Sequence, residues 1–586
     1  MATLNDVFVT LFPDRPAGKD PFAQAPFMPT DIFAYVAHLL ERSGAYHHIV
    51  PEVPSEPHCP YRRIVVDDAM RARARDLGRT WRRSPIPPGR LLPPVPGTVE
   101  ALWLDLGQFR DVPVFVQLND RAEAPGWWAR CLELMMICDE ACEDIGFDTG
   151  NPFFAMVSEP YREGEGFERV QHGPFSLSSA AEDLLCVQAK SRTPSVGCTP
   201  RSLSHHLALL PPRGQVRARW VDPLFADGAK VEERQLGLLL VPFPYRVNDE
   251  AFRPAGIDPG DHFGWFTVEQ TWLPLNDDKY RRGLLVDFVL GLVAEARAKG
   301  ARVDGVVLPE LALNFEQFSS LARALAKDAE IDFLVSGISS DKSKREGNFV
   351  AIMPFFLLGA ERDPEITGWE GLILIREKHH RWKIDARQIK DYNLVGLNRR
   401  RNWWEQLTIL RRSLDLLVYR GNTTLTTLIC EDLARVDPCQ AVVRGVGPNL
   451  LIALLMDGPQ IRDRWPARYA TVLAEDPGTS VLSLTSFGLI ARQNDVGEFP
   501  ESRSVALWKD EKSGVCVLDL PAENDAIVLE LEAVDKEERT LDGRRDHGSA
   551  IRWQYGRHLP IAGRKVPEWI RSGTAPQKSS SDQDAR

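Results

Sequence analysis

The C-terminal half of this 586-residue sequence predicts an α/β fold. From about residue 235 onward, short apolar runs alternate with longer segments whose apolar residues recur at helical spacing. Most of the short runs are apolar throughout, which is typical of strands that are buried on both faces. Strand–helix–strand units repeated in this way indicate a layered α/β domain. The sequence before residue 230 is irregular and rich in proline, and we expect a separate α/β region there.

The first units of the domain combine three strands with two helices. We expect strands at 236–247, 304–310 and 331–338, and helices at 281–300 and 315–329. In the first helix, Leu284, Phe288 and Leu292 recur at helical spacing, and Gly300 provides a C-cap. The strand at 304–310 is apolar until it ends at a carboxylate, Glu310.

The later units are mainly strands. Residues 348–358 and 371–377 resemble a hairpin around a polar loop, and further strands are expected at 423–432, 448–456 and 479–489. The run TTLTTLI is rich in β-branched residues, which favour extended structure. Residues 573–586 have almost no apolar content, and we expect them to form a disordered tail.

The N-terminal region contains some regular structure but no chemistry that we identify. We expect helices at 31–44 and 127–147, strands at 101–106 and 112–118, and a proline-rich loop at 85–97. The helix at 31–44 should stop at Gly44.

Composition excludes several classes of protein. The net charge is −11, which argues against a dedicated nucleic-acid binder because phosphate contacts need a clustered excess of Lys and Arg. The sequence contains no run of 18 apolar residues, so we expect no membrane span. The N-terminus does not resemble a secretory signal. The nine cysteines are an odd number without a CxxC pair, so we expect reduced thiols in a cytoplasmic protein.

Three reactive residues stand at or just after the ends of predicted strands. Glu310 ends GVVLPE, Lys378 follows LILIRE, and Cys430 ends TLTTLIC. Ligands and catalytic groups of α/β folds gather at such strand ends. A cysteine nucleophile needs a base to remove its proton, and a partly desolvated glutamate can act as one. Because attack on a carbonyl or nitrile builds negative charge, a nearby ammonium completes a set able to perform acyl transfer.

These three segments resemble the motifs of the carbon–nitrogen hydrolase (nitrilase) superfamily. VVLPELAL is similar to the family's glutamate motif, REKHH to its lysine motif, and LTTLICEDL to its nucleophile motif. They occur in the family's order, and the text after them, NLLIALLMDGPQ, continues in the family's style. The resemblance covers roughly residues 235–520.

The resemblance implies a four-layer α-β-β-α sandwich over residues 233–562, after an N-terminal region at 1–232 and before a flexible tail at 563–586. It implies a Glu310–Lys378–Cys430 triad that hydrolyses a non-peptide C–N bond of a small molecule through a thioester. Lys378 and the backbone N–H of Glu431 would hold the oxyanion. No cofactor or metal is implied, and a homodimer is expected.

Many family members have a second glutamate between the lysine and the cysteine. Glu405 is the first glutamate after Lys378, and its 25-residue distance to Cys430 suits the family better than its distance to the lysine. We therefore expect Glu405 to be this second glutamate, with an insertion at 381–404.

Simpler readings compete with these. Cys-Glu-Asp also occurs at 142–144, inside a predicted helix, where a cysteine is usually a buried hydrophobe. The segment 376–404 has nine Lys or Arg against three acids and interleaved tryptophans; it is most simply a solvated insertion, but it could recruit an anionic substrate or contact nucleic acid. The pairs His205-His206 and His379-His380 suggest a metal, yet neighbours on a strand point to opposite faces.

Two alternative functions follow from the same residues. The domain could be a nitrilase-fold binding or sensor module with little turnover, which need not activate Cys430. The chain could instead belong to a bacterial conflict or nucleic-acid-associated system, which salt-sensitive binding to oligonucleotides would reveal.

Overall fold

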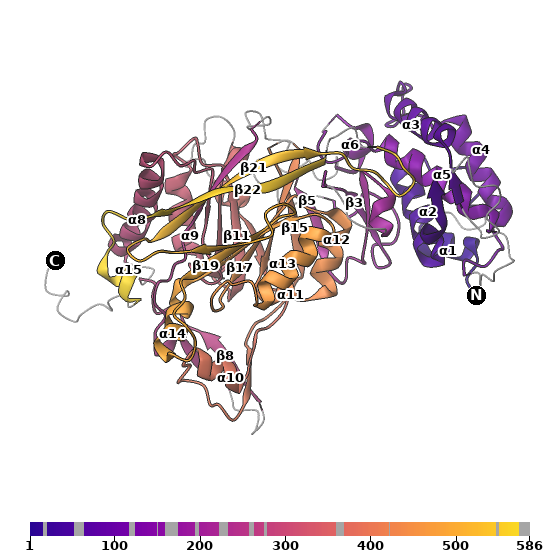
Figure 1. Ribbon diagram of the computed structural model, residues 1–586. Coiled ribbons are helices and arrows are strands. Elements are labelled where there is room, and N and C mark those ends of the chain that lie inside the picture. Colours follow the sequence, from indigo (N-terminus) through magenta and orange to yellow (C-terminus); the bar gives the residue numbers. More distant parts are fainter. Residues whose placement is uncertain are drawn as a thin grey trace.

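The computed structural model is an α/β structure with two large sheets (Figure 1). It describes residues 1–15, 20–51, 64–115, 124–148, 150–158, 174–193, 199–221, 233–256, 263–274, 278–358, 368–420, 422–545 and 550–573. Within these ranges, no helix is both long and apolar enough to span a membrane.

Two seven-stranded sheets form the centre of the molecule. The first has the order β12 (Leu374–Glu377), β11 (Glu346–Pro354), β10 (Phe333–Ser340), β9 (Gly305–Val307), β6 (Gln235–Leu240), β21 (Ala526–Lys536) and β22 (Ala550–Ile561). The second has the order β20 (Val515–Asp519), β19 (Ser504–Lys509), β18 (Ser480–Thr485), β17 (Leu450–Leu455), β16 (Thr423–Ile429), β15 (Ser413–Tyr419) and β5 (Arg217–Val221).

The sheets pack on each other and helices cover them. β11 contacts β16, β12 contacts β15 and β18 contacts β22, so the two sheets face one another. The helices α8 (Lys279–Ala298) and α9 (Phe315–Leu325) lie along the first sheet, whereas α11 (Glu431–Ala434), α12 (Ala441–Val446) and α13 (Trp465–Glu475) lie beside the second (Figure 1). This layering confirms the α/β prediction for the C-terminal half.

Burial explains why the central strands are uniformly apolar or β-branched. Every residue of β16, β17 and β18 is buried, and these three strands pair in parallel. Strands covered on both faces have no exposed positions for charged residues. Three threonines of β16, Thr423, Thr424 and Thr426, place their hydroxyls in internal hydrogen bonds; Thr426 Oγ1, for example, donates to the Asp415 carbonyl at 2.8 Å.

Helix α8 ends just before Gly300, the C-terminal signal expected from the sequence, and both α8 and α9 begin after a side-chain N-cap. Asp278 caps α8 by accepting the Arg281 N–H, and Gly300 follows its C-terminus with a φ of +73°. Asn314 caps α9 in the same way by accepting the Gln317 N–H.

A smaller sheet projects from the sandwich beside α10 (Ala386–Asp391) and α14 (Phe487–Val496) (Figure 1). Its order is β13 (Lys383–Ile384), β14 (Asn402–Glu405), β8 (Phe263–Val268) and β7 (Phe252–Ala255). The expected insertion at 381–404 is therefore paired with a segment about 140 residues earlier in the chain, because β14 lies parallel to β8.

The N-terminal region consists of helices and two small sheets at one end of the molecule (Figure 1). The helices are α1 (Leu4–Leu11), α2 (Pro29–Ser43), α3 (Asp68–Arg83), α4 (Gly97–Leu106), α5 (Gly126–Ala141) and α6 (Pro152–Ser158). β1 (Ile49–Pro51) pairs with β2 (Ile64–Val66), and β3 (Cys186–Ala189) pairs with β4 (Leu207–Leu210).

Some expectations for this region were wrong. Residues 101–106 belong to helix α4, not to a strand: Val99, Trp103 and Leu106 are its buried positions, a helical spacing that a short apolar run does not reveal. Residues 112–115 form a loop with one bridge from Pro113 to Thr3, and 116–118 lie outside the described residues. Helix α5 ends at Ala141, six residues earlier than expected.

The limits of the domains stay predictions, but two observations bear on them. β5 precedes residue 232 and pairs with β15, so the N-terminal region contributes an edge strand to the second sheet. Residues 568–572 form α15 (Glu568–Ser572) with Trp569 and Ile570 buried, so this part of 563–586 is not a flexible tail; residues 574–586 lie outside the described residues.

Candidate active site

The structure brings together the ends of strands from both large sheets. Glu310 follows β9 and Lys378 follows β12 in the first sheet, while Cys430 follows β16 in the second. All three are buried, with exposed fractions of 2%, 1% and 4%. Gly337 on β10 allows the Glu310 turn to pack closely, because a Cβ there would lie 2.5 Å from the Glu310 Cα. The site therefore lies where the two sheets meet.

A buried ion cluster is centred on Lys378. Its Nζ lies 2.8 Å from Oε1 of Glu310 and 2.7 Å from Oε2 of Glu405. Glu405 is thus next to the lysine. Glu405 also accepts the backbone N–H of Trp382 at 3.0 Å. Two carboxylates and one ammonium in a buried place fix the direction of the lysine side chain.

Asn348 on β11 joins the two carboxylates, and sequence analysis did not identify it. Its Nδ2 donates to Oε1 of Glu310 and to Oε1 of Glu405, both at 2.8 Å. The remaining oxygen of Glu310, Oε2, is buried and has no hydrogen-bond partner among the described residues. This oxygen is available to receive a proton.

Cys430 lies at a strained turn between β16 and α11. Its φ is +42° and ψ is −107°, a conformation that non-glycine residues adopt rarely and that clusters at functional sites. The Cys430 N–H donates to the Leu454 carbonyl at 2.9 Å, which ties the turn to β17. The backbone N–H of Glu431 is in the first turn of α11, where N–H groups have no acceptor within the helix.

Burial and the ion cluster determine the protonation of the three groups. Burial raises the pKa of Glu310 above its ordinary value, although Lys378 opposes this. Burial alone would lower the pKa of Lys378, but the carboxylates of Glu310 and Glu405 outweigh it and raise that pKa well above its usual range. Burial and the Glu310 carboxylate raise the pKa of the Cys430 thiol well above 9.0. The resting thiol is therefore protonated and needs a base.

Asp432 connects the cysteine turn to the lysine turn, and this role was also missed. Its Oδ1 accepts the backbone N–H groups of His379 and His380, both at 3.0 Å. The Arg376 guanidinium, 3.4 Å from Oδ2, approaches the same carboxylate from β12. Burial alone would raise the pKa of Asp432, but His379, His380 and Arg376 lower it. The only signal in the sequence was its place two residues after Cys430.

We expect Asp432→Asn to lower turnover without unfolding the protein. An amide nitrogen in place of one oxygen would face the Arg376 guanidinium, so the lysine turn should move relative to Cys430. Losing such charge-assisted hydrogen bonds corresponds to a rate loss of roughly ten- to a hundred-fold. Steady-state kinetics and thermal melting of the variant would measure both effects.

Asp463→Asn is the matched control, because this exposed aspartate lies on neither the lysine turn nor the cysteine turn. A normal rate in Asp432→Asn, or an equal loss in both variants, would contradict the positioning role.

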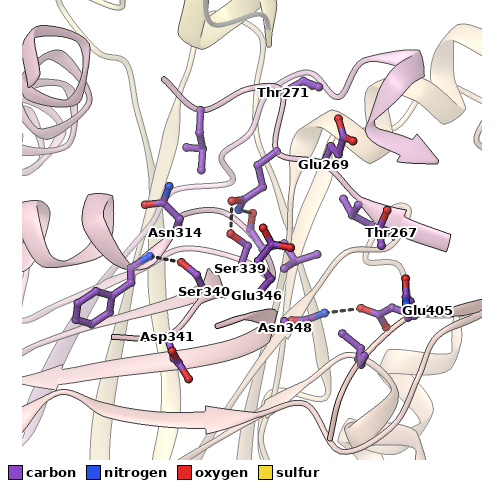
Figure 2. A pocket seen from close by; sticks show the side chains of 18 of the residues that line it. Thr267, Glu269, Thr271, Asn314, Ser339, Ser340, Asp341, Glu346, Asn348 and Glu405 are labelled. Atoms are coloured by element: carbon purple, nitrogen blue, oxygen red, sulfur yellow. Dashed lines mark hydrogen bonds between the residues drawn. The ribbon is translucent and has the colours of Figure 1, made fainter. Parts of the chain in front are cut away.

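A cavity of about 1140 Å³ reaches the ion cluster from one side. Asn348 and Glu405 form part of its wall, and Figure 2 shows them joined by their hydrogen bond at one end of it. Most of the other polar groups around it come from the strand and loop regions near β8, β10 and β11. Glu310, Lys378 and Cys430 do not line this cavity.

One cluster has the donor types of a metal site. Ligand atoms of His379, Asp432 and Cys439 lie within 4.8 Å of one another. All of them already contact protein groups: Nδ1 of His379 lies 2.6 Å from the Cys439 Sγ, and its Nε2 lies 2.9 Å from the Ser413 carbonyl. Burial lowers the pKa of His379 to about 4, so the ring is neutral. These contacts place the cluster among the supports of the lysine turn.

The His205-His206 pair is placed differently. Asp139 of α5 accepts both of their backbone N–H groups, at 2.8 and 2.9 Å.

The seven cysteines among the described residues are free thiols, and Cys142 is fully buried near the end of α5.

Comparison with known proteins gives structural neighbours only. No protein-family model matches the chain, and no curated protein does. Several solved structures of the nitrilase (carbon–nitrogen hydrolase) superfamily match about half of it. An amidase from Nesterenkonia sp. is 14% identical, over 49% of this chain and 91% of its own, with a TM-score of 0.26. Nit3 of Saccharomyces cerevisiae, of branch 10 of the superfamily, is 12% identical over 58% of this chain and 93% of its own, with a TM-score of 0.25.

A further neighbour is a glutamine-dependent NAD+ synthetase from Acinetobacter baumannii. It is 12% identical over 51% of this chain, with a TM-score of 0.29, and the match spans 46% of the synthetase. The identities and TM-scores of these neighbours are too low to assign an activity, so function must come from the site itself.

Proposed function

We propose that this protein is a hydrolase of non-peptide carbon–nitrogen bonds, with Glu310, Lys378 and Cys430 as its catalytic residues and Glu405 as a second glutamate. The single observation that carries the proposal is the buried Glu310–Lys378–Glu405 cluster, whose Glu310 retains one unpaired oxygen. Burial and the charge of Glu310 raise the pKa of the Cys430 thiol, so it is protonated at rest. A protonated thiol and a carboxylate with a free oxygen are the two groups that general-base activation of a cysteine uses.

The first half of the reaction forms a thioester. Glu310 takes the thiol proton, and the Cys430 sulfur bonds to the carbon of an amide or carbamoyl group. A nitrile would instead give a thioimidate, which must take up one water before ammonia leaves and the thioester remains. Negative charge collects on the oxygen of an amide, where the Lys378 ammonium and the Glu431 N–H stabilise it. Glu310 then returns the proton to the nitrogen, the C–N bond breaks, and ammonia or an amine leaves.

In the second half, water attacks the thioester. Glu310 removes a proton from the water, and the water oxygen bonds to the acyl carbon. The bond between the acyl carbon and the Cys430 sulfur then breaks, and Glu310 returns the proton to the sulfur. Glu405 and Asn348 keep Lys378 and Glu310 in place through both halves. The scheme needs no cofactor, and we expect the protein to work in the cytoplasm as a homodimer.

A screen of amides, nitriles, ureas and carbamoyl compounds for ammonia release tests this proposal. With an active substrate, added hydroxylamine should intercept the thioester and give a hydroxamate. The rate should fall as the pH falls through the pKa of Glu310, which burial raises above the ordinary value of about 4.3. The rate falls on the acidic side of this pKa because Glu310 must be ionised to act as the base.

Ammonia release without any hydroxamate, or a hydroxamate that Cys430→Ser forms equally well, would overturn the thioester route. Cys516→Ser is the control, because that thiol is partly exposed on β20 and lies outside the ion cluster. A binding or sensor module is the second candidate, and the burial of Cys430 away from the large cavity favours it. Binding of small amides without ammonia release would support that alternative.

A further inference from the structure

One face of the small sheet is open and aromatic. Trp404 on β14 pairs directly with Trp265 on β8, and Phe263 lies two residues before Trp265 on the same face. Phe263 and Trp404 are 40% and 36% exposed, which is unusual for such large apolar side chains. The Phe263 and Trp265 rings are 6.3 Å apart. Three aromatic rings therefore line one accessible surface.

The opposite face of this sheet is packed against the rest of the protein. The small sheet therefore already has a hydrophobic core, and the open face is its second, outer face. Phe252 and Phe266 are fully buried and contact the Trp382 ring at 6.0 and 5.9 Å. Gly264 is needed on that side, because a Cβ would lie 2.5 Å from the Trp403 ring. Strand alternation then forces the neighbouring aromatic residues outward.

Positive side chains stand directly on the open rings. The Arg381 guanidinium carbon lies 5.7 Å from the centre of the Trp265 ring, and the Lys383 Nζ lies 5.7 Å from that of Trp404. The loop that leads into β14 adds Arg399 and Arg400, both exposed. The net charge of −11 belongs to the whole chain, so it does not reveal this local excess of positive charge.

A hollow of about 450 Å³ lies on this face, and its wall contains no acid. Three aromatic rings, two arginines and two histidines form that wall; Arg381 and Arg435 are the arginines. Flat rings offer stacking surfaces to any base, and arginines attract phosphate. An amino-acid or acyl substrate would use neither the row of rings nor the row of cations.

We propose that this aromatic and basic face binds single-stranded nucleic acid, through base stacking on Trp404, Trp265 and Phe263 and phosphate contacts from Arg381 and Lys383. The occupant follows from charge and shape: the rings are side by side across two strands, and cations flank them. A folded protein partner would need matching acids, whereas a nucleic-acid strand supplies negative charge at every nucleotide.

This surface adjoins the candidate active site: His379 and His380 of the lysine turn form part of the hollow's wall, whereas its aromatic and basic residues lie outside the ion cluster. Trp404 points outward, while the next residue, Glu405, points inward to Lys378. Arg381 follows the lysine turn by three positions. The binding proposal is independent of hydrolase activity, because it concerns residues outside the ion cluster.

Fluorescence anisotropy with the full chain tests the proposal, using a labelled single strand of about 12 nucleotides. We expect salt-sensitive binding that Trp404→Ala weakens on the order of ten-fold through lost stacking. Lys383→Gln should reduce the log–log slope against salt by about 0.7, the value for one phosphate contact on a single strand. Both side chains are exposed, so both variants should fold, which circular dichroism would check.

Tyr280→Ala and Lys327→Gln are matched controls, because they remove an exposed aromatic ring and an exposed lysine from other surfaces. Their binding should equal that of the unmodified chain. Absence of binding, equal loss in the controls, or a mononucleotide that competes as strongly as the whole strand would overturn the proposal. Self-association that Trp404→Ala abolishes, without oligonucleotide binding, would assign the face to a second copy of the chain instead.

Discussion

Replacing Cys430 with serine is expected to lower turnover by at least about a thousand-fold on any substrate that the protein hydrolyses, equivalent to ~4 kcal/mol in the barrier. A hydroxyl has a far higher pKa than a thiol, so Glu310 cannot ionise it at neutral pH. The strained turn at Cys430 should survive, because serine is close to cysteine in size. Initial rates at saturating substrate, with melting curves for both proteins, would measure the effect.

Cys516→Ser is the matched control, because this thiol is partly exposed on β20 and takes no part in the cluster. Glu310→Gln should cause a comparable loss, and the double variant should be little worse than either single one, because the base and the nucleophile act together. Wild-type rates from Cys430→Ser would show that the chemistry lies elsewhere in the chain.

The positions of Glu310, Lys378 and Cys430 could be expected from the sequence because each follows an apolar strand. A buried strand needs an apolar run, and the polar residues after that run lie at or near the end of the strand. Glu405 could be anticipated from its distance to Cys430. What the sequence could not provide is the distance between these groups, since Lys378 comes from one sheet and Cys430 from the other.

Asn348 and Asp432 could not be found in this way. Asn348 begins no motif: its position depends on the register of β11 against β12, in which Phe349 pairs with Glu377. Asp432 accepts the backbone N–H groups of His379 and His380. Every residue except proline has such a group, so the residue types in the sequence do not reveal this contact. Both residues act through pairing between segments that are far apart along the chain.

Long-range pairing also explains what the fold prediction omitted. β5 and β15 lie almost 200 residues apart, and the sequence of neither strand indicates that the two pair. The hairpin of β21 and β22 extends toward the N-terminal helices, and its connection carries Arg544 to them (Figure 1). Local periodicity predicts an element, but it contains no information on which surface that element will cover.

Arg544 joins the two halves of the molecule through a buried charge cluster. It is almost fully buried and lies 3.0 Å from Asp139, from Glu140 and from Asp542. Burial alone would raise the pKa of Asp139, but Arg544, with His206 and His205, lowers it to about 2. Asp139 in turn accepts three backbone N–H groups at 205–207, so one arginine supports α5, the segment before β4 and the β21–β22 connection together.

Arg544→Met should therefore destabilise the protein by about 3–5 kcal/mol at pH 7, because it leaves buried carboxylates without their cation. The sign of the pH dependence follows from Asp139. With Arg544 present, its lowered pKa contributes stability above the ordinary pKa of 3.8, which is lost as the pH falls through about 2. Without the arginine, burial should raise that pKa instead, so protonation would favour the folded state.

The deficit of the variant should consequently shrink as the pH is lowered from 7 to about 5, which urea unfolding at several pH values would measure. Arg545→Met is the matched control: this adjacent arginine is 56% exposed at its side chain and lies 3.5 Å from Glu537, and exposed pairs contribute about 0–1 kcal/mol. Equal, small losses in both variants would mean that the cluster does not hold the halves together. A large loss in Arg544→Met that is constant with pH would assign the effect to packing of the hairpin rather than to the unpaired carboxylates.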